Sequence, residues 1–502
     1  MTSPLPRLPP QLSARAAARR HDLPERVLQF GEGNFLRAFV DWMLERMNQA
    51  GLFHGAAVLI QPLPYGNAGL LNEQDGLYTV ALRGLQEGRT IDTRELVSCV
   101  TRCVDPYADF AGFLRCGLNP DTRFVVSNTT EAGIRTDLAD AADARPAASF
   151  PGKLTQLLHA RYRHFHGDPA RGWTMLPCEL IETNGDALRA AVVDTARRWR
   201  LEAAFLDWLD SACVFANTLV DRIVTGYPAD DAPRIHAEIG WQDRLLVAAE
   251  PFHAWVIGAQ GSIEKELPLA QAGLDVVWTA DVAPYRERKV RILNGVHTIA
   301  AAIGRLAGLR TVADCMADGE VRMFLESAIA EEIRPTLRLP ATELDAFTRS
   351  VLDRFHNPFL RHQLDDIALN ATSKVRTRLV PAIADRQRAC GRPPRRLALA
   401  LAAVIASGRA ANADTGHTPH GPAALAVRDE PAALRALHAA WSGRTHGPLD
   451  PASARAVVAP FLADASLWGS DLTEAIPGIE ELVAAALSAI TIGGIRAALA
   501  TT

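Results

Sequence analysis

The sequence has few cysteines, and none of them lies in a pattern that would indicate a disulfide framework or a metal site. There are seven, at positions 99, 103, 116, 178, 213, 315 and 390, with no CxxC pair and no cluster with histidine. This usage is typical of a reducing compartment and predicts no bound metal. Residues 1–21 also lack the apolar stretch of a secretory signal. We therefore expect a cytoplasmic protein whose residues 1–22 form a loose tail.

Long apolar runs and an excess of charge of one sign are missing as well. The most apolar run, residues 397–406, is short, because a membrane-spanning helix needs about 20 apolar residues. A formal net charge of −4 gives no attraction to nucleic acid or to an anionic membrane, so we expect neither as a partner. The chain is 48% hydrophobic and 22% charged, as globular proteins are, and its 502 residues predict two domains.

The first domain, residues 23–282, alternates strand and helix patterns. A short buried strand at 26–30 is followed by a glycine turn, then by apolar residues at helical spacing from 35 to 47, and then by a second strand. This order predicts a Rossmann-type α/β domain that binds a dinucleotide. The further predicted strands are at 56–60, 123–127, 174–181, 214–224, 253–257 and 275–279, with helices between several of them, such as 186–200.

The second domain, residues 283–502, has almost no strand pattern and is expected to be mostly α-helical. Its segment 408–427 is rich in Gly, His, Pro and Ala and predicts a surface loop. The predicted helices are at 284–306, 319–333, 341–355, 364–370, 394–406, 431–441, 452–463 and 478–490.

The glycine turn FGEGNFLR at 30–37 predicts a site for the pyrophosphate of a dinucleotide. Glycines let a phosphate approach the backbone, and the following helix offers N–H groups and a partial positive charge. Arg37 could add a positive charge nearby. The pattern departs from GxGxxG, because Leu36 stands at the third glycine position. Glu32 lies between the glycines, where we expect its side chain to point away from phosphate.

The end of the second predicted strand bears on the choice of cofactor. NAD-binding folds usually carry an acid there for the ribose hydroxyls, but this chain has Gln61 and no acid close by. No basic cluster for a 2′-phosphate is present either, so the sequence favours NAD without excluding NADP. After the third strand, Asn128 and Thr129 lie in SNTTEAGI at 127–134, which fits either a nucleotide site or an ordinary helix-capping turn.

Lys289, Asn294 and His297 are the strongest catalytic candidates. On a uniform α-helix Asn294 lies about 140° and His297 about 80° round from Lys289, so all three project from one side. An amine, an amide and an imidazole can hold an alcohol or ketone oxygen and move its proton. A lysine in water, with a pKa of ~10.4, is a poor base at neutral pH, so this role requires desolvation or a nearby cation such as Arg288. The alternative is a solvated charge run and a structural histidine.

Two further groups of polar residues are substrate candidates. Asn217 and Asp221 lie in an apolar stretch, where Asp221 could instead pair with Arg222. Lys374, Arg376 and Arg378 could grip a carboxylate, although a solvated basic face explains them equally well.

These segments together resemble the mannitol dehydrogenase family, the long-chain polyol dehydrogenases that need no zinc. The matches are GxGxFxR at 31–37, NTxxDR at 217–222 and KxxxxNxxH at 289–297. Longer phrases resemble the uronate branch of that family, from residue 23 to about 490. They include QFGEGNFLRAFVDW at 29–42, TLVDRIVTGYP at 218–228 and RFHNPFLRHQLDDIALN at 354–370.

The resemblance implies roles for particular residues. Lys289 would be the acid/base, with Asn294 and His297 holding the reacting oxygen, and Lys374 matches a basic residue of the family. Asn217, Asp221, Lys374 and Arg376 are the substrate-binding candidates. The candidate nucleotide-binding residues are Val27, Leu28, Gln29, Phe30, Gly31, Glu32, Gly33, Asn34, Phe35, Leu36, Arg37 and Ala38, together with Gln61, Asn128 and Thr129.

The reaction implied is the NAD-dependent, reversible reduction of D-tagaturonate to D-altronate, a small-molecule step of hexuronate catabolism. The epimeric substrate D-fructuronate, a polyol, or a non-catalytic NAD-binding regulator are the alternatives, and the oligomeric state is left open. Two departures argue against a mannitol-like substrate. The chain has Cys178-Glu179-Leu180 where polyol members have Cys-Asp-Asn, and Asp366 where they have arginine. The carboxylate grip remains open among Lys374, Arg376, Arg378 and His362.

Overall fold

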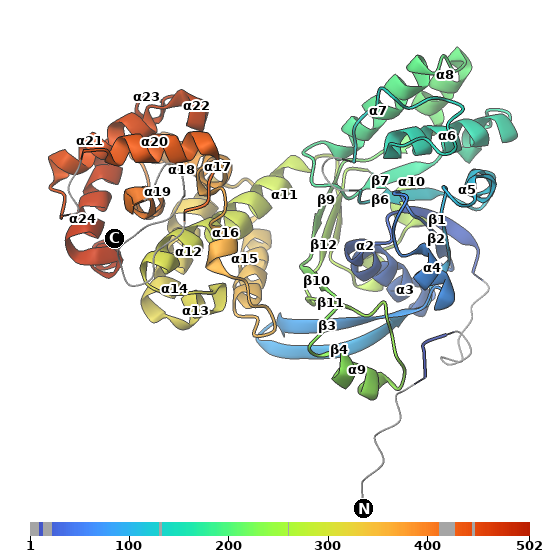
Figure 1. Cartoon of the computed structure of the whole chain (residues 1–502), viewed down its shortest axis with the longest axis horizontal. Helices are drawn as coiled ribbons and strands as arrows, with labels where there is room; N and C mark the ends of the chain where they lie inside the picture. Colours follow the sequence, from blue (N-terminus) through green and yellow to red (C-terminus); the bar gives the residue numbers. More distant parts are fainter. Residues whose placement is uncertain (1–9, 14–22, 130–132, 260, 411–426, 444–446) are drawn as a thin grey trace, which may run out of the picture. The chain divides into compact units, whose positions relative to one another are not determined.

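A computed structural model of the chain describes residues 10–13, 23–129, 133–259, 261–410, 427–443 and 447–502. The chain divides into two compact units, residues 1–83 with 90–282 and residues 84–89 with 283–502 (Figure 1). Four residues of the predicted tail are described, and they are held in place. Leu12 is buried, and its N–H donates to the carbonyl of Gln242 at 2.9 Å. The rest of the segment 1–22 lies outside the described residues.

The N-terminal unit is built on a six-stranded parallel sheet, which confirms the predicted Rossmann-type α/β fold. Its strand order is β5-β2-β1-β6-β7-β8. The chain leaves β1 in one direction through β2 and β5 and in the other through β6 to β8, so the order reverses beside β1, where ligands bind in such sheets. The strands are β1 (Glu25–Phe30), β2 (Ala56–Ile60), β5 (Val100–Val104), β6 (Phe124–Ser127), β7 (Thr174–Pro177) and β8 (Val214–Phe215).

Alternate side chains of these strands enter two separate cores, because successive residues of a strand point to opposite faces. Val27 and Leu59 face a helix formed by α2 (Asn34–Leu36), η1 (Arg37–Asp41) and α3 (Trp42–Gln49). Leu28, Phe30 and Ile60 face the opposite layer. Figure 1 shows that layer above β6 and β7. It consists of α5 (Phe110–Gly117), α6 (Phe150–His164), α7 (Asn184–Arg198) and α8 (Ala203–Ala212).

Two smaller sheets complete this unit. One has the order β10-β11-β3-β4 and the other β13-β12-β9. The prediction missed β5, β11 and the hairpin of β3 and β4, whose turn has positive φ at Glu87 and Gly88. The strands are β3 (Tyr78–Gln86), β4 (Arg89–Val97), β9 (Thr218–Asp221), β10 (Val224–Gly226), β11 (Val247–Ala249), β12 (Ala254–Ile257) and β13 (Val276–Trp278).

The prediction of one strand over 214–224 is wrong. The stretch forms three short strands, β8, β9 and β10, and each joins a different sheet. The breaks fall at Asn217, whose side chain turns to cap α7, and at Arg222, whose guanidinium lies over the Trp42 ring at 4.2 Å. Side-chain contacts far away in the sequence therefore divide a run that looks continuous locally.

Among the residues that the structure describes from Ala283 onward, all the regular elements are helices, which confirms the predicted helical domain. The predicted helix 478–490 is longer, and the predicted loop 408–427 lies mostly outside the described residues. The larger elements are α11 (Ala283–Arg288), η4 (Lys289–Asn294), α12 (Gly295–Leu306), α13 (Val312–Ala317), α14 (Gly319–Ser327), η5 (Ala328–Ile333), α15 (Ala341–Phe355), α16 (Leu364–Ile367), α17 (Ala371–Arg378), α18 (Val380–Cys390), α19 (Arg395–Ser407), α20 (Pro431–Trp441), α21 (Pro451–Leu462), α22 (Ala465–Trp468) and α24 (Ile479–Ala500).

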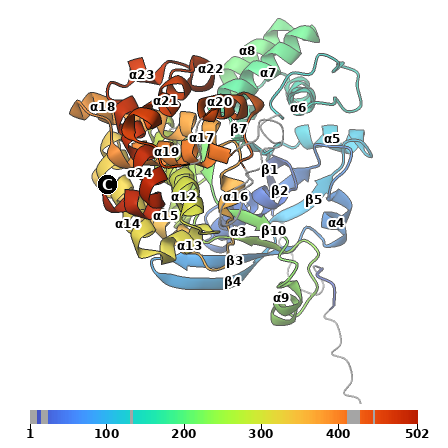
Figure 2. The same cartoon turned by 60° about the vertical axis from the view of Figure 1, so that its left-hand side comes forward.

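The helix α12 runs through the middle of this unit. It contacts α13, α14, α16, α17 and α19 (Figure 2). In the part of the chain that the structure describes, one helix, α24, is long and apolar enough to cross a membrane by length and composition. Its buried side chains pack against α19 and α21.

Candidate active site

The glycine turn lies directly beyond β1, at the point where the strand order reverses. Gly31 has φ of +118°, and a β-carbon there would come within 3.3 Å of the Asn128 carbonyl oxygen. Its N–H donates to the Ile60 carbonyl at 3.0 Å, which ties the turn to the end of β2. A side chain at Gly31 is therefore disfavoured by both the backbone angle and the close approach of the next strand.

Gly33 opens the helix that begins at Asn34, and it leaves the N-terminus of that helix uncovered. It is the N-cap residue, no side chain caps the helix, and a β-carbon at Gly33 would meet no atom within 4 Å. The first backbone N–H groups of a helix suit the oxygens of a pyrophosphate. The residues present therefore fit a dinucleotide at this turn.

The twelve residues predicted around the turn divide into a buried set and an accessible set. Gly33 and Asn34 are exposed and Phe35 is half-buried, whereas the others are buried. The buried residues Val27, Leu28, Gln29, Phe30, Leu36 and Ala38 lie under the turn and fix its shape.

Arg37 is buried, and its guanidinium donates hydrogen bonds to acceptors of the protein itself. The guanidinium donates to the Glu32 carbonyl at 3.1 Å, to Asn34 Oδ1 at 2.7 Å and to the Leu245 carbonyl. It also lies over the Tyr78 ring at 5.0 Å. Burial lowers the pKa of Arg37. The contacts with Glu32 and Asn34 fix the turn itself, and those with Leu245 and Tyr78 hold it against the rest of the unit.

The segment after β2 is organised by Gln61 and Glu32. Gln61 is buried; its Nε2 donates to the Leu63 carbonyl at 3.0 Å, and its Oε1 accepts the Ala68 N–H at 3.2 Å. Glu32 Oε1 accepts the Asn67 N–H at 3.2 Å, so its carboxylate bridges from the glycine turn to this segment. Burial raises the pKa of Glu32.

Ser127 ends β6, the other neighbour of β1, and Asn128 and Thr129 follow it. Asn128 Nδ2 donates to the Cys178 carbonyl at 2.9 Å. Glu179 is buried and accepts from Ser127 Oγ at 3.0 Å, from the Thr129 N–H at 2.9 Å and from Thr129 Oγ1 at 3.0 Å. The acid at this altered Cys-Glu-Leu position therefore shapes the loop after β6. The role of Glu179 was missed because the predicted strand 174–181 includes this residue, whereas β7 ends at Pro177.

Asn217 and Asp221 lie at either end of β9. Asn217 Oδ1 accepts the Gly185 N–H at 2.9 Å, and its Nδ2 donates to Asp186 at 2.9 Å, so the side chain caps α7. Asp221 is buried opposite Ala254 of β12.

Lys289, Asn294 and His297 come from one continuous helix, but the helix is not uniform. A π turn spans Lys289–Asn294 between α11 and α12, which corrects the prediction of a regular α-helix. In a π turn the backbone bonds join residues i and i+5. Lys289 and Asn294 are therefore about one turn apart and stack on one face more closely than the α-helical spacing allows. Such turns are frequent at functional sites.

Asn294 and His297 are partly accessible within a stretch of this helix that is otherwise buried. From Arg291 to Arg305 every residue is buried except Asn294 and His297, which are partly accessible. Lys289 is partly accessible as well. Arg288 is buried, and its guanidinium lies over the Phe347 ring at 4.3 Å. From Arg291 onward, Asn294 and His297 are thus the side chains of this stretch that could reach a ligand, and Lys289 lies beside the accessible residues Glu287 and Val290.

Two rings fix the surroundings of His297. The Phe355 ring centroid lies 4.3 Å from that of His297, and the His362 ring meets it edge-on at 4.9 Å. Burial and the nearby Lys374 charge lower the pKa of His362, while Asp366 opposes that shift. His362 therefore belongs to the same neighbourhood as the catalytic candidates and the basic helix α17.

The three cations of α17 point in different directions. Arg378 donates to the Asn294 carbonyl at 3.3 Å and to Thr298 Oγ1 at 3.2 Å. Lys374, one turn earlier, donates to the Ile367 carbonyl at 2.8 Å, and burial lowers its pKa. Arg376 donates to the Leu467 carbonyl of α22 at 3.1 Å. Arg378 thus contacts the backbone of Asn294, whereas Lys374 and Arg376 donate to carbonyls of α16 and α22.

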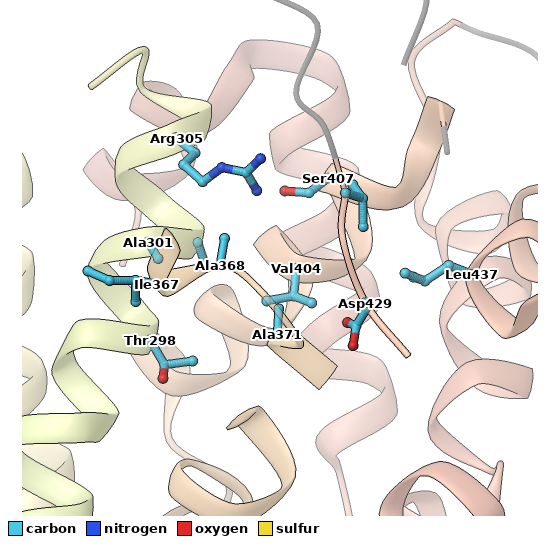
Figure 3. A pocket seen from close by; sticks show the side chains of 12 residues that line it. Thr298, Ala301, Arg305, Ile367, Ala368, Ala371, Val404, Ser407, Asp429 and Leu437 are labelled. Atoms are coloured by element: carbon cyan, nitrogen blue, oxygen red, sulfur yellow. The ribbon is translucent and has the colours of Figure 1, made fainter. Parts of the chain in front are cut away.

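A cavity lies further along α12, next to Thr298, which Arg378 contacts, and Ile367, which Lys374 contacts. It encloses about 450 Å³, part of it open to solvent, and it is lined mainly by small and apolar side chains (Figure 3). Thr298 and Ala301 border it from α12, and Val404 borders it from α19. Lys289, Asn294 and His297 do not line it, so the chemistry of the side chains and not this cavity identifies the candidate site.

Both units match family models. The mannitol dehydrogenase Rossmann domain matches residues 25–271, and the mannitol dehydrogenase C-terminal domain matches residues 281–489. The chain belongs to the mannitol dehydrogenase family. A dinucleotide cofactor of the NAD type is consistent with this membership and with the glycine turn described above.

Relatives within the mannitol dehydrogenase family narrow the comparison. The chain is 43% identical to an altronate oxidoreductase of Klebsiella pneumoniae subsp. pneumoniae over 477 residues, which are 95% of this chain and 96% of that protein. It is 44% identical to an altronate oxidoreductase of Escherichia coli over the same length and shares.

Two solved structures share the fold at 22% identity. A D-sorbitol dehydrogenase in substrate-free form has a TM-score of 0.77 and covers 95% of each chain. A Pseudomonas fluorescens mannitol 2-dehydrogenase in complex with NAD and D-mannitol has a TM-score of 0.66 and covers 98% of this chain and 96% of its own.

Proposed function

We propose that this protein catalyses the reversible reduction of D-tagaturonate to D-altronate with NADH. The observation that carries the proposal is the similarity to altronate oxidoreductases, 43–44% identical across both units. The partly accessible Lys289, and Asn294 and His297 within the otherwise buried stretch 291–305, support the same chemistry.

The proton is handled by the C-terminal unit. In reduction, the Lys289 ammonium gives a proton to the oxygen of the keto group; in oxidation, the neutral amine takes the hydroxyl proton. The Asn294 amide donates to that oxygen, and His297, held between Phe355 and His362, orients it. When bound, NADH supplies the hydride that the keto carbon accepts.

The nucleotide is held by the N-terminal unit. The N–H groups that follow Gly33 take the pyrophosphate, and Asn128 and Thr129, fixed by Cys178 and Glu179, flank it from the neighbouring strand. Gly31 and Gly33 keep the approach clear of side chains. Arg37 acts on the nucleotide through the shape of the turn, because its own hydrogen bonds are made within the protein.

The substrate carboxylate is gripped by cations of α17. Lys374 and Arg378 lie four residues apart on that helix; Lys374 donates to Ile367 of α16, and Arg378 donates to Asn294 and to Thr298 of α12. Arg378 combines a bidentate donor with a position beside Asn294, so it is the stronger candidate of the two. Arg376 reaches Leu467 instead, which favours a structural role for it.

The test follows NADH consumption by the purified protein with D-tagaturonate, D-fructuronate and D-fructose in parallel. A strong preference for tagaturonate is expected. Preference for fructuronate would keep the chemistry and overturn the choice of epimer. Binding of NADH without turnover of any of the three would instead favour a non-catalytic nucleotide binder.

A further inference from the structure

The residue after β2 is not an acid in this chain, although dinucleotide-binding folds usually have one there to bind the ribose. In dinucleotide-binding folds an acid at the end of the second strand accepts hydrogen bonds from the ribose hydroxyls of NAD and repels the 2′-phosphate of NADP. Here β2 ends at Ile60 and is followed by Gln61. Both ends of the Gln61 amide are used to fold the next segment, onto Leu63 and Ala68. Gln61 is therefore committed to the protein and does not replace the acid.

The carboxylate of Glu32 reaches this position from the neighbouring strand. β1 and β2 run parallel with Phe30 opposite Ile60, so the residues that follow them lie at the same edge of the sheet. Glu32 Oε1 accepts the Asn67 N–H at 3.2 Å. A β-carbon on Gly66 would lie 2.2 Å from Glu32 Oε1 and 2.7 Å from Gln61 Oε1. The two side chains thus converge on one glycine, and the Glu32 carboxylate stands beside the residue that follows β2.

The other neighbour of β2 also carries an acid at this edge. β5 ends at Val104 and is followed by Asp105, which accepts the Tyr107 N–H at 2.8 Å. Burial is the largest cause of the raised pKa of Glu32, and the negative charge of Asp105 adds to that shift.

A buried cation also contacts the residues that follow β5. Lys153 is fully buried, and its Nζ donates to Tyr107 Oη at 3.0 Å and to the Ala148 carbonyl at 2.7 Å.

We infer that Glu32 takes the place of the missing ribose acid and, through its charge, makes the protein select NAD over NADP. The inference rests on the proposed function only for the class of cofactor. A carboxylate offers about four lone-pair sites, and the backbone N–H groups of Asn67 and of Glu32 itself occupy two of them. Glu32 therefore holds the segment after β2 and still accepts from a ribose hydroxyl. A 2′-phosphate at the same place would bring like charges together, which costs affinity.

The test measures the Kd values of NADH and NADPH by fluorescence titration without any keto acid. The wild-type protein is compared with Glu32→Gln, which keeps the shape and an acceptor for Asn67 but removes the charge. Glu73→Gln is the matched control, because Glu73 is an exposed acid of the helix α4 (Ala68–Glu73) that pairs with Arg244 at 2.9 Å. We expect wild type to prefer NADH, and Glu32→Gln to reduce the ratio of the two Kd values by about tenfold or more. Glu73→Gln should leave the ratio unchanged.

A second variant keeps the test decisive if Glu32→Gln is poorly folded. Glu32→Asp retains the charge but withdraws it by one methylene group, so it should still reject NADPH while binding NADH several-fold more weakly. A ratio in Glu32→Gln within about twofold of wild type would overturn the inference. Equal affinity of wild type for both nucleotides would also overturn it, and the proposed reaction would stand. Binding of neither nucleotide would overturn both.

Discussion

Arg378 donates to the backbone carbonyl of Asn294 at 3.3 Å and to Thr298 Oγ1 at 3.2 Å. The guanidinium thus ties α17 to the residue proposed to hold the reacting oxygen. Replacing Arg378 by Met should lower kcat/KM for tagaturonate by roughly 10²-fold, because it removes both the proposed partner of the substrate carboxylate and the contact that positions Asn294. Arg378→Lys should recover part of the loss, since a point charge cannot reproduce two directed hydrogen bonds. Steady-state kinetics would check both, with the exposed Arg388→Met as control; equal activity of all three variants would contradict the role.

Lys289 is the residue on which proton transfer depends in the proposed reaction. Lys289→Ala should reduce kcat by roughly 10²–10⁴-fold, the usual contribution of a positioned acid/base. NADH binding, measured by fluorescence, should be unchanged because the glycine turn is untouched. The decisive measurement is kcat across the pH range. If the variant stayed within a few-fold of wild type at every pH, Lys289 would not be the acid/base.

A change at Glu179 should weaken nucleotide binding and leave proton transfer unaffected. It accepts from Ser127 Oγ at 3.0 Å and from the Thr129 N–H at 2.9 Å, so both carboxylate oxygens are used. Glutamine has one acceptor oxygen, and its NH₂ group would face a donor. Hydrogen bonds to charged groups contribute about 1.5–3 kcal/mol, so Glu179→Gln should raise the Kd of NADH roughly tenfold or more. Titration of the variant against Glu182→Gln, an exposed acid of the same loop, would show no difference if the loop did not matter.

Asp41 should make stability fall as pH rises. It is fully buried, accepts from Tyr78 Oη at 2.7 Å and from Gln29 Nε2 at 3.2 Å, and burial raises its pKa to about 7. Because the folded-state pKa lies above the ordinary value of 3.8, the folded protein holds one more proton than the unfolded chain between these limits. The contribution of Asp41 to stability is therefore greatest below pH 4 and declines as pH rises toward 7.

Asn at position 41 is uncharged at every pH, so it tests this dependence directly. Asp41→Asn should be more stable than wild type at pH 8, by an amount on the order of 1–3 kcal/mol, and similar to it at pH 4. Thermal unfolding of both proteins at the two pH values measures the difference. A variant less stable than wild type at pH 8 would show that the ionised carboxylate is needed by its neighbours, Arg37 foremost.

The features that could be predicted from sequence are those fixed by neighbouring residues. The glycine turn, the helix stripe from 35 to 47 and most helices of the second unit follow from local spacing. The helix periodicity of 371–378 would also have separated Arg376 from Lys374 and Arg378, had that segment been predicted as a helix, because residues four apart share a face and residues two apart do not.

What could not be predicted depends on partners far away in the sequence. The π turn at Lys289–Asn294 contains no residue type that distinguishes it from an ordinary α-helix in the sequence. The bridge from Glu32 to Asn67 spans 35 positions, and the cap that Asn217 places on α7 spans more than 30. Both arise only when strands come together at one edge of a sheet, so a linear pattern carries no trace of them.

The stretch 214–226 gives one short strand to each of the three sheets of the N-terminal unit. A sheet that begins to separate must therefore pull on the same few residues that the other two sheets hold. Local opening of the nucleotide-binding sheet is thereby coupled to opening of its smaller companions, and the three should exchange their backbone hydrogens with solvent as one cooperative block. The three short strands β8, β9 and β10 thus make the N-terminal unit unfold cooperatively.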